Sequence, residues 1–126
     1  MSTDFRLTPH ADYVHVALEP GYEITPPGVT ELMMSVSDVC SRQGQRRVLV
    51  EGTVVARRMG TMDSFGAGAL AGSMLPGVSL ACCFYGYKTD DQSQFFRDVA
   101  QNRGVRVDFF NDRDEALRWL GVRSQP

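Results

Sequence analysis

The sequence predicts an α/β fold with a mixed, mainly parallel sheet of about five strands and about four helices. Segments that alternate apolar and polar residues, as half-buried strands do, are interleaved with segments whose apolar residues recur at helical spacing. Their order along the chain is ββαβαβαβα. Strands separated by helices join a sheet in parallel. The 126 residues fit one domain, which is expected to cover residues 1–126.

The first two strands are expected to pair as a hairpin. Phe5 to Thr8 is a short candidate edge strand, and Pro9 ends it because proline cannot donate to a strand ladder. Tyr13 to Leu18 alternates strictly, with an apolar branched side chain at every second position. One face of this second strand is therefore predicted to be buried.

The first helix is predicted from its two ends. Thr25 offers a capping hydroxyl and two prolines follow it, a combination typical of a helix start. Apolar residues then recur at helical spacing as far as Gly44, a residue type that commonly ends helices. The next segment, Arg47 to Glu51, has the composition of a buried strand, and the valines at 54–55 can extend it.

A second helix is expected after a loop that runs through Gly60. Either Asp63 or Ser64 can cap it, and it should end near Leu75 because Pro76 follows. This helix contains three glycines, each of which costs about 1 kcal/mol relative to alanine in a helix. They are Gly66, Gly68 and Gly72. Close packing on the sheet or on a second subunit would compensate for them, as would a backbone that must approach a ligand.

The clearest strand is the segment "VSLACCFYG" at residues 78–86. Asp90 and Asp91 begin the next helix, where acidic side chains suit the positive end of the helix dipole. Gly104 closes this helix. Its predicted apolar stripe is Phe95, Phe96, Val99 and Ala100.

A last strand and helix follow. The segment "VRVDFF" at residues 105–110 alternates as a strand does. Asp112 and Glu115 then form a capping-box pattern for a helix with an apolar face that includes Trp119.

Composition narrows the function classes. The formal net charge is −2 and the charges are scattered, whereas nucleic-acid binding needs a basic stripe. The first ten residues lack the apolar core of a signal peptide. Apolar stretches fall far short of the ~20 residues of a membrane-spanning helix. We therefore expect a cytoplasmic protein without a membrane span and without a nucleic-acid partner.

Two strings resemble the STAS superfamily of anti-sigma-factor antagonists, and more closely the bacterial STAS-like (SpoIIAA-like) group related to CRAL-TRIO lipid-binding domains. One is "FFRDVAQNRGVRVDFFNDRDEALRWL", and the other is "MDSFGAGALAG", which is similar to the signature "MDSSGLG". In true antagonists, the serine just after the signature aspartate is phosphorylated. The resemblance places Asp63, Ser64 and Gly66 on that motif, while Phe65 replaces the usual second serine.

Ser64 is thus the sharpest candidate for phosphorylation or partner contact. A phosphate near a helix N-terminus would meet free N–H groups and would add about −2 charge. The alternative is that Asp63 or Ser64 merely caps the helix. Tyr85, Tyr87 and Lys88 follow the fourth main strand and are expected on the same sheet rim as Ser64, as a binding rim or as an ordinary aromatic loop.

The cysteines and histidines suggest no further chemistry. Cys82 and Cys83 should point to opposite faces of a strand, and with Cys40 they form an odd count typical of a reducing compartment. Such buried thiols are usually inert. His10 and His15 lack ligand partners at metal-binding spacing, so no metal is expected, and His15 is predicted to be a half-buried strand residue.

Three functions follow, in order of preference. The first is a non-enzymatic STAS-like regulatory or protein-interaction module, as a homodimer or with a regulatory partner protein. The second is binding of a small apolar, lipid-like ligand between helix and sheet, where Phe95, Phe96 and Trp119 are either core or pocket wall. An enzyme has the least support, because no catalytic set and no cofactor motif can be identified.

Overall fold

Six strands form one mixed sheet in this computed structural model, which describes residues 5–57, 60–86, 88 and 90–122. The strands are β1 (Phe5–Pro9), β2 (Val14–Leu18), β3 (Tyr22–Ile24), β4 (Arg47–Arg57), β5 (Ser79–Tyr85) and β6 (Arg106–Phe110). The sheet order is β1-β2-β4-β5-β6, and β3 pairs with the C-terminal half of β4. β1 and β2 form the predicted antiparallel hairpin, and the other pairs are parallel.

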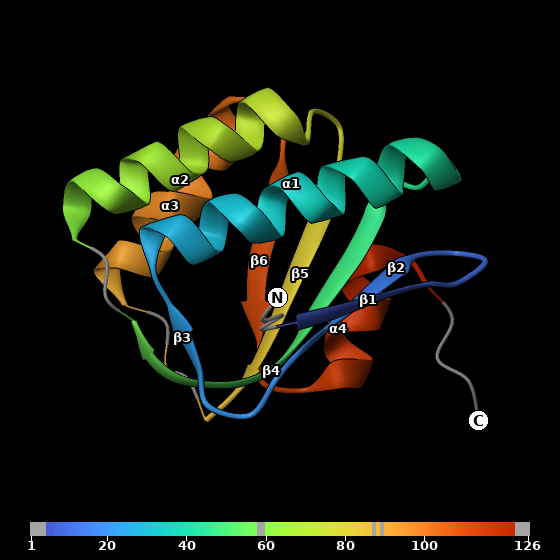
Figure 1. Cartoon of the computed structure of the whole chain (residues 1–126), viewed down its shortest axis with the longest axis horizontal. Coiled ribbons are helices and arrows are strands. Elements are labelled where there is room, and N and C mark those ends of the chain that lie inside the picture. Colours follow the sequence, from blue (N-terminus) through green and yellow to red (C-terminus); the bar gives the residue numbers. More distant parts are fainter. Residues whose placement is uncertain (1–4, 58–59, 87, 89, 123–126) are drawn as a thin grey trace.

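Four helices cover the two faces of this sheet in the described residues. They are α1 (Pro26–Gln43), α2 (Thr61–Met74), α3 (Asp91–Asn102) and α4 (Arg113–Leu120). Helices α1, α2 and α3 lie together on one face, and α4 lies on the other (Figure 1). The predicted fold class, a mainly parallel α/β sheet with about four helices, is confirmed.

Most helix ends lie where local signals placed them. The Thr25 hydroxyl accepts the N–H of Gly28 at 3.1 Å, and Gly44 ends α1 in the left-handed conformation with φ 67°. The carboxylate of Asp90 accepts the N–H of Ser93 at the start of α3. Asp112 caps α4 by accepting the N–H of Asp114.

The start of α2 differs from the prediction. Gly60 is the capping residue, and Thr61 is already helical. Asp63 lies in the first turn, where its carboxylate reaches back to accept the N–H of Gly60 at 3.1 Å. The helix therefore begins earlier than expected, after Gly60, while Asp63 does cap it, from inside the first turn.

The sequence analysis also missed strand β3. This strand has three residues, too few for an alternation that could be recognised. Tyr22 pairs with Val54, and a register irregularity follows between Tyr22 and Glu23. The predicted extension of β4 past Glu51 is confirmed, since the strand runs to Arg57.

Two apolar clusters fill the two sides of the sheet. The larger lies under α1, α2 and α3 and includes Val16, Val50, Cys82 and Val107. The smaller lies under α4 and includes Leu49, Ala81, Cys83 and Leu117. Cys82 and Cys83 therefore point to opposite faces, as predicted.

Two glycines allow α2 to approach α3 closely. A Cβ atom on Gly68 would lie 2.7 Å from Cβ of Val99, and one on Gly72 would collide with Cβ of Arg103. A Cβ atom on Gly66 would meet nothing within 4 Å. The compensation for Gly68 and Gly72 is thus helix-to-helix packing, rather than packing on the sheet as expected.

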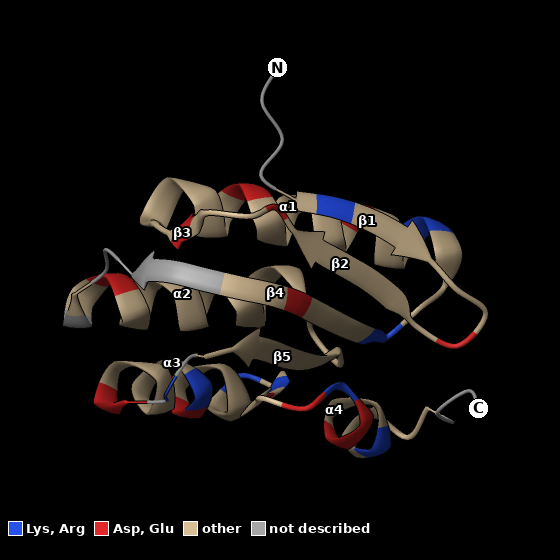
Figure 2. Cartoon of the chain, turned by 90° about the horizontal axis from the view of Figure 1, so that it is seen from below, with Lys and Arg blue, Asp and Glu red and all other residues tan. Residues whose placement is uncertain are grey.

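Helices α3 and α4 each carry both acidic and basic residues, whereas β5 carries neither (Figure 2). No helix in the described part of the chain combines the length and the apolarity that crossing a membrane requires.

Candidate functional site

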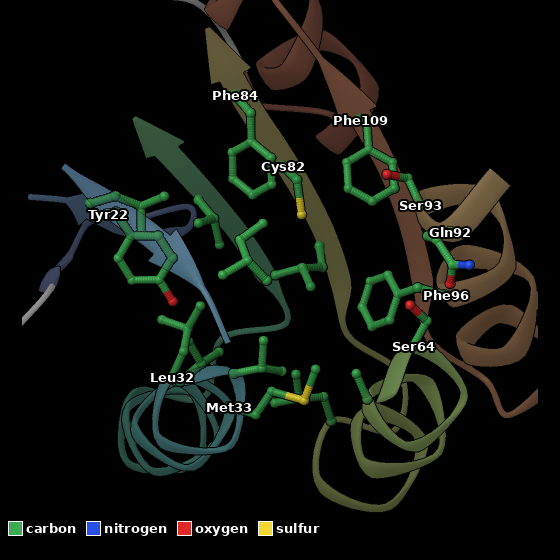
Figure 3. Close-up of a pocket in the computed structure, with 18 residues that line it drawn as sticks. Tyr22, Leu32, Met33, Ser64, Cys82, Phe84, Gln92, Ser93, Phe96 and Phe109 are labelled. Atoms are coloured by element: carbon green, nitrogen blue, oxygen red, sulfur yellow. The ribbon is translucent and has the colours of Figure 1, made fainter. Parts of the chain in front are cut away.

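A cavity of about 100 Å³ lies between the sheet and the three helices that cover its larger face. One water needs roughly 10–15 Å³ of such space, so the cavity could hold several water molecules. Its wall is almost entirely apolar. Lining side chains include Leu32, Met33 and Val36 of α1, Ala67 of α2, Phe96 of α3, and Leu80, Cys82, Phe84 and Phe109 of the sheet (Figure 3).

Four polar side chains also line this cavity, namely Tyr22, Ser64, Gln92 and Ser93. The Ser93 hydroxyl donates to Oδ1 of Asp90 at 3.1 Å. Ser64 is only 3% exposed, and no hydrogen bond joins its hydroxyl to any residue in the described part of the chain. Ser64 and Phe96 face the same space from α2 and α3 (Figure 3).

Ser64 is buried because α2 begins earlier than predicted. Ser64 is the fourth helical residue, and Ala67 and Ala71 follow it at the spacing of one helix face. That face packs into the larger cluster. Ser64 therefore does not lie on an exposed rim, and its phosphorylation stays a prediction about a buried residue. Asp63 and Gly66, in contrast, are exposed and do not line the cavity.

Ser64 and Tyr85, which were predicted to share one rim of the sheet, do not lie together. Tyr85 packs against the smaller cluster under α4, whereas Ser64 lies on the opposite side of the sheet. Their expected proximity is wrong, because the strand pleat turns Tyr85 away from the α2 side. Lys88 is exposed, and Tyr87 lies outside the described residues.

A second group of polar residues surrounds Glu51 of β4 on the α4 side of the sheet. Oε1 of Glu51 lies 2.7 Å from Nε2 of His15, and Oε2 accepts the hydroxyl of Tyr85 at 2.5 Å. Nε of Arg113, the first residue of α4, lies 3.8 Å from Oε1. The Glu51 side chain is 17% exposed. One carboxylate thus joins β2, β5 and α4.

This polar cluster of His15, Glu51, Tyr85 and Arg113 favours the charged form of Glu51. Burial alone raises the pKa of Glu51, but the hydrogen bonds with Tyr85 and His15 and the Arg113 guanidinium outweigh it. The pKa of Glu51 therefore lies below its ordinary value. Burial and the bond to Glu51 raise the pKa of Tyr85. Glu51 is an ionised acceptor, and Tyr85 is a neutral donor.

The sequence analysis missed this cluster because its members lie on separate elements. His15 and Glu51 are 36 positions apart, and only the strand register brings them together. The prediction that His15 is a half-buried strand residue is confirmed. The one available signal was Glu51 itself, a charged residue in an otherwise apolar strand, since such residues are rarely buried without partners.

Exposed apolar side chains gather where α2 and α3 begin. Met62 is 78% exposed, Phe65 41% and Phe95 36%, and the rings of Phe65 and Phe95 stack with centroids 6.3 Å apart. The prediction that Phe95 belongs to the core stripe is wrong, whereas Phe96 lines the cavity. Trp119 packs against the smaller cluster.

The described residues contain no group of His, Cys, Asp and Glu able to hold a metal ion. All three cysteines are buried and free. Burial, with smaller contributions from Asp108 and Cys83, raises the pKa of Cys82 to about 12, so this thiol stays protonated at neutral pH.

Comparison with solved structures identifies the fold. The chain is similar to the crystal structure of an uncharacterised protein of the DUF3478 family with a SpoIIAA-like fold, from Shewanella loihica PV-4. The TM-score is 0.50 and the sequence identity 16%, over 95% of this chain and 98% of that one. No family model and no curated protein matches the sequence. The chain has a SpoIIAA-like fold, as the resemblance implied.

Proposed function

We propose that this protein binds a small apolar molecule in the cavity between the sheet and helices α1, α2 and α3. The observation that supports the proposal is the cavity itself, about 100 Å³ in volume and lined by no charged side chain in the described residues. Binding pockets for small molecules have this character, an apolar wall with a few polar groups.

The volume limits the ligand. An engineered cavity of roughly 150 Å³ in another protein stays dry and holds benzene or xenon. The present cavity is smaller, so a benzene-sized ring requires a small movement of its wall. Met33 lines the cavity and has the flexibility that such a movement needs. The ligand that best matches this volume is a small ring or a short chain rather than a complete long-chain lipid.

An empty cavity of this size is costly to the fold. At roughly 24 cal/mol per Å³, it lowers stability by about 2 kcal/mol relative to a filled core. A ligand that fills it restores part of the lost contacts and stabilises the folded state in proportion to its concentration. The expected signature of binding is therefore stabilisation by an uncharged apolar molecule.

The test is a benzene titration followed by methyl NMR. We expect benzene to shift the methyl signals of Leu32, Val36 and Leu80, which line the cavity. The variant Ala67→Leu places extra atoms in the cavity and should abolish these shifts. The matched control is Ala69→Leu on the same helix, because Ala69 does not line the cavity.

Xenon under pressure provides a smaller probe that does not require the wall to move. Shifts with xenon in the unmodified protein and in Ala69→Leu, but not in Ala67→Leu, support the proposal. If neither benzene nor xenon shifts the cavity methyls of the unmodified protein, the proposal is wrong.

We propose protein contact as a second function, through the exposed apolar cluster of Met62, Phe65 and Phe95. Solvent-exposed aromatic side chains that stack on each other are favourable contact groups. A second copy of the chain is the partner we infer, as in the predicted homodimer. A regulatory partner, a cytoplasmic location and the lack of catalysis stay predictions.

Sedimentation velocity tests this second function. Phe65→Ser should weaken a dimer, whereas Met34→Ser should not, because Met34 is 55% exposed on α1 and lies outside the cluster. A protein that stays monomeric at every concentration would exclude the homodimer.

A further inference from the structure

We propose that the ligand in this cavity carries a hydroxyl group on its apolar body, and that the Ser64 hydroxyl binds that group. The ligand class is then small uncharged phenols and cyclic alcohols. This inference rests on the proposed ligand-binding function, and it assigns a specificity to the same cavity.

The hydroxyl of Ser64 lies at the wall of the cavity. A hydroxyl in such a place gains from a hydrogen bond that a ligand supplies. Ser64 is 97% buried, as its 3% exposure implies, and no residue in the described part of the chain bonds its hydroxyl. Its N–H is already used in the helix, where it donates to the carbonyl of Gly60 at 3.0 Å. The free donor and acceptor of Ser64 therefore belong to its side chain, at the cavity wall.

Three other polar side chains line the described wall, namely Tyr22, Gln92 and Ser93. Ser93 is engaged with Asp90, both through its hydroxyl and through its N–H. Tyr22 and Gln92 also have interactions of their own. Of the two serines in the described wall, Ser64 is thus the one whose hydroxyl no described residue bonds.

The cavity favours a ligand without charge. No charged side chain in the described residues lines the cavity, so a carboxylate or an ammonium group would lose its hydration without gaining a counter-charge. A neutral hydroxyl needs only one good hydrogen bond.

The experiment compares phenol with benzene, two rings that differ by one hydroxyl. Dissociation constants for both are measured by methyl NMR in the unmodified protein and in Ser64→Ala. We expect the variant to keep its benzene affinity and to lose phenol affinity by about three- to tenfold, the usual effect of one neutral hydrogen bond. Ser93→Ala, on the same wall, should leave the ratio of the two constants unchanged, because its hydroxyl is bound to Asp90.

The outcomes separate the two proposals. If benzene binds the unmodified protein and Ser64→Ala leaves the phenol-to-benzene ratio unchanged, the assignment to Ser64 is overturned and the apolar cavity stands. If neither ring binds, the proposed function itself fails. Ser64→Cys, which keeps the size of the side chain and has a much weaker donor, should lower the phenol affinity as well. An unchanged ratio in that variant also counts against the assignment.

Discussion

Glu51 is a carboxylate whose charge depends on three other elements. His15 comes from β2, Tyr85 from β5 and Arg113 from α4, and each provides a donor or a positive charge to it. A buried carboxylate without such partners would take up a proton, because desolvation disfavours the charged form. With them, the pKa of Glu51 falls below its ordinary value.

Because the pKa of Glu51 is lowered in the folded state, Glu51 makes the stability of the protein decrease at acidic pH. A group with a lower pKa in the folded state contributes stability above its unfolded pKa, and that stability is lost as the pH falls through the folded pKa. Glu51→Gln should therefore lower the free energy of unfolding by about 1–3 kcal/mol near pH 7, and by clearly less near pH 3. Urea unfolding at the two pH values measures this difference.

Glu19→Gln is the matched control for Glu51→Gln. Glu19 pairs with Arg6 at 3.5 Å, but its side chain is 44% exposed, and such surface pairs contribute little. The change in the free energy of unfolding caused by Glu19→Gln should be close to zero at both pH values. A loss for Glu51→Gln that is the same at both pH values would show that the charge of Glu51 has no stabilising role.

At the scale of an element, α2 is held by contacts that only glycine allows. Gly68 and Gly72 lie one turn apart and face α3, and Gly66 faces open space. Replacement of glycine by alanine should thus change the free energy of unfolding in opposite directions at Gly66 and Gly68.

Gly68→Ala should destabilise the protein by about 1–3 kcal/mol, because the added methyl group forces α2 away from Val99. Gly66→Ala should stabilise it by about 1 kcal/mol through helix propensity alone. Guanidinium unfolding of the two variants and the unmodified protein gives both values. Stabilisation by both substitutions would mean that α2 and α3 do not pack closely.

Local signals explain which elements could be predicted. Thr25, Asp90 and Asp112 cap their helices through side chains that lie next to the helix in sequence, so the starts of α1, α3 and α4 were visible. The start of α2 was not, because Gly60 offers no side chain and Asp63 acts from inside the first turn. Because the helix begins at Thr61, Ser64 is its fourth residue and lies at the cavity wall instead of at the helix start.

At the scale of the whole molecule, the sites depend on register and packing that no short segment records. The alternation of β2 predicts one buried face and the apolar run of β5 predicts a buried strand, but the pairing with β4 decides that His15 and Tyr85 meet Glu51. The cavity likewise forms where three helices and the sheet fail to fill a common space. The fold class was therefore predictable, whereas the cavity and the polar cluster were not.

The cavity also sets how the whole molecule responds to pressure. Unfolding under pressure eliminates internal voids, and the magnitude of the unfolding volume scales with the void volume that is lost. We expect Ala67→Leu, which fills the cavity, to reduce the magnitude of the unfolding volume, and Ala69→Leu to leave it unchanged. Saturating benzene should act on the unmodified protein as Ala67→Leu does.

The fluorescence of Trp119 under pressure provides the measurement, because this residue is the only tryptophan. It belongs to α4 and packs against the smaller cluster, on the opposite side of the sheet from the cavity. Its signal therefore reports unfolding of the molecule rather than local filling. Equal unfolding volumes for the unmodified protein and Ala67→Leu would mean that the cavity is filled by its own walls in solution. The ligand-binding proposal would then lose its physical basis, since a molecule with no void to eliminate has no space to offer a ligand.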